Sequence, residues 1–196
     1  MLEPTYPLRT ERLDLRPYDE SDVEFLYEMQ SDSETTRYIP YGPLTRDESR
    51  TSFDLKAQRR VLRGEGEALQ LVAVLRESGE PVGEATLGWP SETHQCGEVG
   101  YLVHRDHRGR GYATEMSREM LRLAFEDFGW HRVIARLEAR NTASVAVLER
   151  LGMRREAHFV SNEIFKGEWS DELVYALLAD EWRARAEAVD GPGPHR

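Results

Sequence analysis

Only one cysteine, Cys96, occurs in the 196 residues, so an intrachain disulfide cannot form. No apolar run approaches the roughly 20 residues that a membrane span needs. The N-terminal stretch lacks an apolar signal core as well, and we therefore expect a cytoplasmic protein. An excess of basic residues is also missing, because the net charge is −10. This charge disfavours nucleic acid as a partner and favours a cationic one such as an amine, although it also serves solubility.

The residues that are present suit a folded domain. Hydrophobic residues make up 39% and charged residues 32% of the chain, which provides one core in a domain of ordinary size. We expect a single domain over residues 1–189. The remaining stretch "DGPGPHR", 190–196, is predicted to be a disordered tail.

Strand and helix patterns alternate along the chain. Six segments are predicted as strands: 12–18, 69–75, 84–89, 98–103, 132–137 and 171–178. Helical patterns cover 22–30, 45–62 and 113–128, and Asn141 opens a further short helix that Gly152 closes. Hairpins come first and strand–helix units later, so the pattern predicts a mixed α/β domain.

The stretch "HRGRGYATEM", 107–116, places two glycines and several basic side chains where a helix begins. Helix N-termini carry unpaired amides, and glycine lets an anion approach the backbone closely. The stretch thus predicts a phosphate or pyrophosphate site. The Walker pattern is absent, and Thr114 stands where a dinucleotide fingerprint needs its third glycine. The alternative interpretation is an arginine-rich turn with a purely structural role, and the pattern does not exclude it.

Several separated stretches resemble one family. "RGRGYA", 108–113, resembles the cofactor signature of the GNAT superfamily of N-acetyltransferases, and "LRTERLDLRPYDESD", "GEVGYLVHRDHRGRGYATE", "NTASVAVLERLGM" and "FKGEWSDELVYALLADEW" resemble its RimJ/RimL-type branch. The resemblance implies an α/β (α+β) GNAT-type fold. Its central sheet would be mixed but mostly antiparallel, flanked by helices, with splayed strands at the acyl-CoA site.

The resemblance also implies acetyl-CoA as the co-substrate. The strand residues Tyr101, Leu102 and Val103 would pair with its pantetheine arm. Asn141 would contact it as well. The pyrophosphate would lie on the loop and first helical turn formed by Arg108, Gly109, Arg110, Gly111, Tyr112, Ala113 and Thr114.

Three residues are implied for catalysis. Ser144, in the Asn-x-x-Ser pattern, would give a proton to the departing sulfur, and Leu148 excludes the tyrosine that many relatives carry there. Glu163 matches the branch's proposed base. Glu98, on the strand before the cofactor loop, is an alternative base whose pKa burial would raise. Glu84, on the preceding strand, is a third candidate for the base, and each of these groups also suits a structural role.

The acceptor is less defined. The implied reaction is transfer of an acetyl group to a protein N-terminal α-amine or a small amine, with a homodimer as the expected assembly. A non-catalytic acyl-CoA-binding module and transfer of a longer acyl group such as succinyl stay open. Tyr38, Tyr41 and Pro43 are candidates for the acceptor pocket. No metal site is expected, because His104 and His107 lack further ligands.

Overall fold

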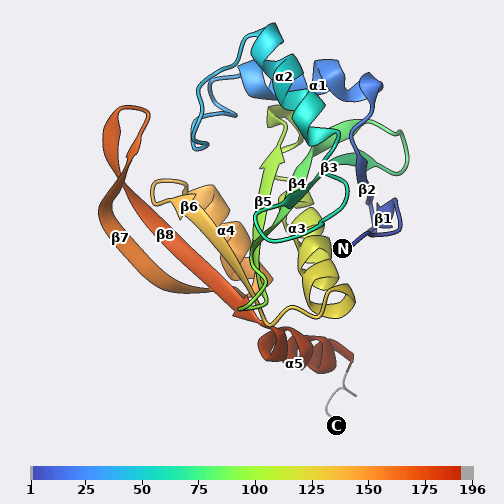
Figure 1. Ribbon diagram of the computed structural model, residues 1–196, viewed down its shortest axis with the longest axis vertical. Coiled ribbons are helices and arrows are strands. Elements are labelled where there is room, and N and C mark those ends of the chain that lie inside the picture. The colour runs from blue at the N-terminus through green and yellow to red at the C-terminus, as the bar shows by residue number, and fades with distance from the viewer. Residues whose placement is uncertain (1, 191–196) are drawn as a thin grey trace.

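The computed structural model describes residues 2–190, in which eight strands form one mixed sheet (Figure 1). The order across the sheet is β1-β2-β3-β4-β5-β6-β8-β7. Neighbouring strands are antiparallel except β5 and β6, which run parallel. The strands are β1 Leu8–Arg9, β2 Leu13–Pro17, β3 Ala68–Leu75, β4 Pro81–Ser91, β5 Cys96–Val103, β6 Arg132–Glu138, β7 Arg154–Phe165 and β8 Glu168–Leu178. The expected mixed, mostly antiparallel sheet is confirmed.

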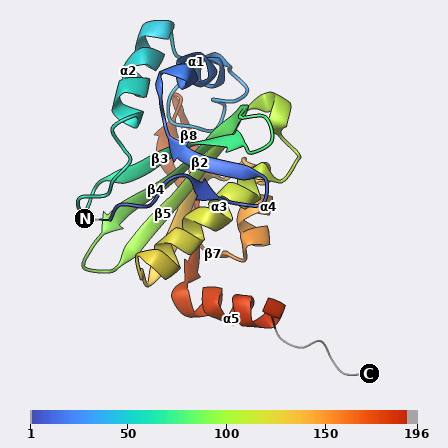
Figure 2. The same ribbon diagram turned by 90° about the vertical axis from the view of Figure 1, so that its right-hand side faces the viewer.

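Helices flank this sheet within the described part of the chain. They are α1 Val23–Ser31, α2 Arg46–Lys56, α3 Tyr112–Arg122, α4 Thr142–Leu151 and α5 Ala179–Asp190. Short 3₁₀ turns cover Glu20–Asp22 and Arg105–His107, and a π-helical turn over Leu123–Asp127 extends α3. In Figure 1 and Figure 2 the pair α1 and α2 lies at one end of the sheet, and α5 lies at the opposite end. None of the described helices is long and apolar enough to cross a membrane.

The alternation in "LQLVAVL" of β3 explains why both faces of the sheet are covered. Leu69 and Leu71 are fully buried in the larger core, where α3 and α4 contribute Met116, Met120 and Leu148. Val72 and Val74 point to the other face and pack in a second core with residues of α1 and α2. Side chains alternate between the faces of a strand, so β3 supplies both cores.

Local capping sets the starts of α2 and α4. The Thr45 side chain and the Glu48 backbone, and the Glu48 side chain and the Thr45 backbone, form a reciprocal capping box. Asn141 Oδ1 accepts a hydrogen bond of 3.1 Å from the Ser144 amide and caps α4. Both helix starts were predicted from the sequence.

Several elements differ from the sequence prediction, and β1 and α5 are among those that were not predicted. Helix α2 ends at Lys56 rather than at residue 62, because Leu62 leaves the helix to form a bridge with Leu2 and is fully buried. Strand β7 was not predicted, since its side chains are exposed at almost every position. The predicted tail over 190–196 lies outside the described residues except for Asp190, the last residue of α5.

Candidate functional site

Strands β5 and β6 separate after a short paired segment. They pair only at Cys96↔Arg132, Gly97↔Val133 and Glu98↔Ile134, although β5 continues to Val103 along β4. Beyond Glu98 no described strand pairs with β5 on its β6 side, over five residues or about 17 Å, and at the far end of this edge the Val103 carbonyl accepts a hydrogen bond of 3.3 Å from Arg108 Nε. An open edge of this kind can pair with an extended ligand. The predicted cofactor residues Tyr101, Leu102 and Val103 lie on it.

The loop over residues 104–111 follows β5 and leads into the N-terminus of α3. It is the predicted cofactor loop. Gly109 and Gly111 have φ values of 75° and 84°, the left-handed region that favours glycine. Gly111 is the N-cap of α3 and has no side chain to satisfy the first-turn amides. A Cβ at Gly109 would meet no atom within 4 Å. The space beside Gly109 is thus open, while Arg12 Nη2 would lie 3.4 Å from a Cβ at Gly111. A glycine loop and guanidinium at the positive end of a helix form an arrangement that binds anions.

Arg12 of the β1–β2 connection fixes this loop from outside. Its Nη1 donates to the Arg110 carbonyl at 2.9 Å, and its Nε donates to Glu115 Oε2 at 2.7 Å. Its guanidinium also lies 4.7 Å from the ring centroid of Tyr112. Burial opposes ionisation of Glu115, but hydrogen bonds from Thr10 and Arg12 outweigh it and lower the pKa of that carboxyl. Sequence reasoning did not find this contact, because the partners are about a hundred residues apart.

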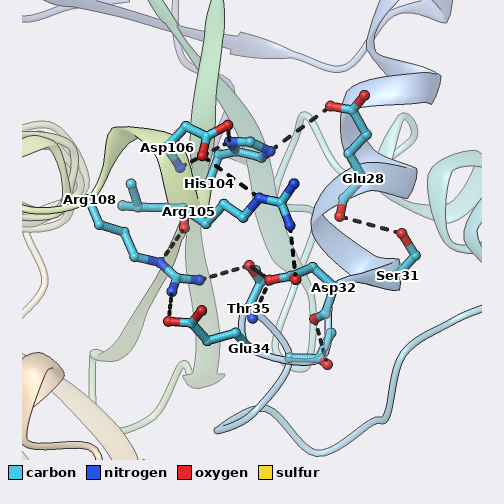
Figure 3. Close-up of polar contacts among 11 residues, drawn as sticks. Glu28, Ser31, Asp32, Glu34, Thr35, His104, Arg105, Asp106 and Arg108 are labelled. Atoms are coloured by element: carbon cyan, nitrogen blue, oxygen red, sulfur yellow. Dashed lines mark hydrogen bonds and ion pairs between the residues drawn. The ribbon is translucent and has the colours of Figure 1, made fainter.

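Arg105 and Arg108 reach away from the loop toward the segment that follows α1 (Figure 3). Arg108 Nη1 donates to Glu34 Oε1 at 3.0 Å, and its Nη2 donates to Thr35 Oγ1 at 2.7 Å. Arg105 Nη1 lies 3.4 Å from Asp32 Oδ1. These two arginines therefore join the cofactor loop to the connection between α1 and α2.

Two other basic residues lie at the N-terminal turn of α3. Arg110, a predicted phosphate contact, forms no side-chain hydrogen bond or ion pair among residues 2–190. Arg150, on α4, donates to Thr114 Oγ1 at 3.3 Å. Arg150 was not predicted from the sequence, where it appears only as a basic residue on a helix. Its contact with Thr114 places the Arg150 guanidinium beside the first turn of α3.

A hydrogen bond crosses from β5 to α4. The Tyr101 hydroxyl donates to the Ser144 carbonyl at 3.2 Å, and burial raises the pKa of Tyr101 to about 12. This contact brings the predicted cofactor strand against the first turn of α4, which also carries Asn141. Three of the predicted site residues, Tyr101, Asn141 and Ser144, thus lie together where β5 faces the first turn of α4.

Glu98 stands at the last paired position before the strands separate. It is half-buried, and burial raises the pKa of its carboxyl above the usual range. Arg136 opposes this shift, and the negative charge of Glu172 adds to it. Arg136 Nη1 in turn lies 3.6 Å from Glu172 Oε1. A carboxylate with a raised pKa beside an opening is a common feature of acid–base sites.

Glu163 lies elsewhere, on the hairpin formed by β7 and β8. Its side chain is exposed, and its backbone is in register with Ser170. The hairpin projects beyond the rest of the sheet in Figure 1. The structure does not bring Glu163 into hydrogen-bonding contact with Glu98 or Ser144.

Glu84 is held by two buried partners. Lys56 Nζ donates to both carboxylate oxygens, at 2.9 and 2.7 Å, and the Tyr18 hydroxyl donates at 2.6 Å. Burial and the negative charge of Glu84 raise the pKa of Tyr18 well above its usual value. This triad anchors α2 to the sheet, so Glu84 suits a structural role better than that of a base.

His104 and His107 belong to the loop itself, and their side chains are largely buried. Their ring centroids are 5.9 Å apart, and that of Tyr112 lies 6.4 Å from His107. Within residues 2–190 no group of three or more His, Cys, Asp or Glu side chains is arranged to hold a metal ion.

Comparison with known proteins agrees with this geometry. The acetyltransferase (GNAT) domain family matches residues 12–154. The uncharacterized N-acetyltransferase YnaD of Bacillus subtilis (strain 168) is 31% identical over 175 residues, which cover 89% of this chain and 98% of YnaD. A GNAT-family acetyltransferase from Bacillus anthracis superposes with a TM-score of 0.79 at 29% identity, covering 88% of this chain and 98% of the other.

A more distant structure shows the same fold. Spermidine N-acetyltransferase from Vibrio cholerae, in complex with CoA and spermine, has a TM-score of 0.74 at 18% identity and covers 87% of this chain and 98% of its own. The match over most of the chain and the separated strands beside a glycine-capped helix point the same way: the protein belongs to the GNAT family of N-acetyltransferases.

Proposed function

We propose that the protein transfers an acetyl group from acetyl-CoA to a primary amine, by direct attack of the amine in a ternary complex. One observation carries the proposal: the open edge of β5 runs directly into the glycine-capped start of α3. A thioester bound along the edge and a diphosphate on the helix would then be parts of one ligand.

The residues present fit acetyl-CoA. The amides of the first turn of α3 and the guanidinium groups of Arg110 and Arg150 would hold the diphosphate. The backbone of Tyr101 to Val103 would pair with the pantetheine arm, and Asn141 would line it. When bound, acetyl-CoA supplies the activated acetyl thioester. The open space beside Gly109 leaves room for a phosphate near the backbone.

For the proton transfers we propose Glu98 and Ser144. Glu98, whose pKa is raised by burial, would take a proton from the attacking amine, directly or through water. Ser144, in the first turn of α4, would protonate the sulfur as the carbon–sulfur bond breaks. The positive end of α4 would stabilise the developing thiolate. We thus rank Glu98 above Glu163, the reverse of the order that the sequence resemblance implies, because Glu163 is exposed on the hairpin.

The acceptor class is narrowed by proton chemistry. The attacking amine must be neutral, and α-amines titrate near 8 whereas lysine side chains titrate near 10.4. This difference favours a protein N-terminal α-amine over a lysine side chain, and the RimJ/RimL-type resemblance adds a small amine as the other class that we propose. The small-amine class is supported by the Vibrio cholerae structure, which is that of a spermidine N-acetyltransferase.

We also propose one domain over residues 1–189 and a homodimer. The dimer is supported by four large apolar side chains that are exposed on the β7–β8 hairpin: Phe159, Val160, Ile164 and Trp169. Sedimentation equilibrium tests the assembly, and Val160→Asp is expected to give monomers. A cytoplasmic location stays a prediction from the sequence.

The transfer itself is tested with acetyl-CoA and a panel of amines. Mass spectrometry should detect an acetylated amine, and a thiol reagent should detect an equal amount of free CoA. Gly111→Asp places a negative charge in the diphosphate site, and at subsaturating acetyl-CoA it should lower both signals together. Acetyl-CoA turnover without any acetylated amine would contradict the proposal.

A further inference from the structure

A cavity of about 200 Å³ lies on the β7–β8 side of the cofactor loop. Three segments form it: the connection between α1 and α2, the residues that join β6 to α4, and the turn of the β7–β8 hairpin. Figure 1 shows these segments facing one another. The lining residues are Arg37, Tyr38, Arg140, Phe165, Lys166 and Glu168.

Two cations of this cavity have no acidic partner. Lys166 Nζ donates to the Thr36 carbonyl at 2.6 Å, and the Arg37 guanidinium lies 5.0 Å from the ring centroid of Tyr38. Neither side chain forms an ion pair with a carboxylate within residues 2–190. In a chain of net charge −10, two unneutralised cations at one cavity favour an anionic ligand.

The third cation, Arg140, is partly neutralised. Its Nε donates to Glu138 Oε1 at 2.8 Å, and its Nη1 lies 4.0 Å from Glu168 Oε2. Glu138 is buried and also accepts a hydrogen bond of 2.8 Å from Ser170 Oγ. One lining carboxylate, Glu168, therefore faces three lining cations, and the balance at the cavity surface stays positive.

The cavity wall is fixed before any ligand binds. Thr35 and Thr36 are buried, and each is held from a different side. Arg108 of the cofactor loop donates to the Thr35 hydroxyl (Figure 3), while Lys166 of the hairpin donates to the Thr36 carbonyl. Because Arg37 directly follows this pair, these contacts set its backbone position, while its side chain is exposed. A preformed wall lowers the entropic cost of binding.

The cavity also adjoins the proposed reaction centre. Arg140 immediately precedes Asn141, the N-cap of α4, whose first turn contacts Tyr101 through Ser144. One lining residue, Arg140, is thus the sequence neighbour of the N-cap of the helix that we assign to the thioester sulfur. A cavity beside this helix start would hold the end of the acceptor that is remote from its reacting amine.

We propose that this cavity binds an anionic group of the acceptor, so that the substrate is a primary amine that also carries a carboxylate or phosphate. The inference rests on the proposed N-acetyltransferase function and narrows its substrate class. Arginine and lysine bind such groups through charge-assisted hydrogen bonds, and Tyr38 and Phe165 would cover the apolar part of the acceptor. A phosphate of acetyl-CoA is the other source of the same chemistry, and the experiment separates the two.

The experiment compares matched acceptors. One pair is 4-aminobutyrate and 1,4-diaminobutane, and a second is Ala-Glu-Ala amide and Ala-Lys-Ala amide, which differ in one charged group. With the unaltered protein, kcat/KM should be at least about tenfold higher for the anionic member. Arg37→Gln and Lys166→Gln should each remove most of this preference, and Arg37→Lys should retain part of it. Arg183→Gln, an exposed change on α5, is the control and should retain all of it.

Binding gives a readout that does not depend on turnover. With CoA present as a non-reacting partner, calorimetry should show tighter binding of Ala-Glu-Ala amide than of Ala-Lys-Ala amide. Equal or reversed binding of the two peptides would overturn the inference, while acetylation of the lysine peptide would leave the N-acetyltransferase proposal intact. A loss of acetyl-CoA affinity in Arg37→Gln, with both peptides affected equally, would assign the cavity to the cofactor and also overturn it.

Discussion

Gly111→Asp and Gly111→Asn form a pair that differs by one charge at the proposed diphosphate site. Gly111 is the N-cap of α3 with φ of 84°. Asparagine and aspartate both tolerate this left-handed backbone better than other residues, and both are good N-caps. The two variants should therefore fold equally well. Aspartate should even be slightly favoured, because its charge complements the positive end of α3.

Their affinities for acetyl-CoA should differ in the opposite sense. A carboxylate at about 5 Å from one phosphate charge costs about 3 kcal/mol at an effective dielectric constant near 20. Arg12 Nη2 lies 3.4 Å from where the new Cβ would stand, so pairing with Arg12 would offset part of this cost. We expect at least about 1.4 kcal/mol to remain, which is tenfold in Kd.

Calorimetry with acetyl-CoA measures the difference, and thermal unfolding of both variants checks the fold. The expected result is weaker binding by Gly111→Asp than by Gly111→Asn, with a midpoint of unfolding at least as high. If the two bound acetyl-CoA equally, the diphosphate would not lie on this turn.

Other substitutions separate catalysis from stability. Glu98→Gln should remove the acidic limb of the pH profile of kcat/KM, and Glu163→Gln should leave that limb unchanged. The reverse outcome would assign the base to Glu163. The pKa of Glu98 is raised in the folded state, so ionisation of this carboxyl lowers the stability of the fold as pH rises through that pKa. Glu98→Gln should thus raise Tm at neutral pH but not below about pH 4, where the carboxyl is protonated in both states. An equal rise in Tm at both pH values would show that the change does not come from the ionisation of Glu98. Ser144→Ala should lower kcat at least about tenfold with little change in the Kd of acetyl-CoA, and a loss confined to Kd would rule out a role in proton transfer. Glu84→Gln should cost about 3–5 kcal/mol in denaturant unfolding, because Lys56 would stay buried without a counter-charge, and a loss below about 1 kcal/mol would show that Lys56 reaches solvent.

Features set by neighbouring residues were predictable from the sequence. The cofactor loop was found because glycines at a helix start have a local meaning, and α4 was found because Asn141 caps it and Gly152 ends it. Strand β3 was predicted from its alternation. In each case the physical cause lies within a few residues of the element itself.

Features set by distant partners were not predictable from residue patterns. The separation of β5 from β6 was expected only through family resemblance, since nothing in "GEVGYLV" shows where pairing stops. Strand β7 was not predicted because both of its faces are exposed, so its sequence has no alternation of buried and exposed residues. The partners of Arg108 lie more than seventy residues away, so its contacts with Glu34 and Thr35 had no sequence signal.

The most direct test of the account is a crystal structure with acetyl-CoA, or with CoA, bound. We predict the diphosphate on the amides of the first turn of α3 and the pantetheine arm along Tyr101 to Val103, between β5 and β6. A cofactor bound elsewhere, or an opening between β5 and β6 that stays closed to it, would contradict the central claim that these two features form one acyl-CoA site.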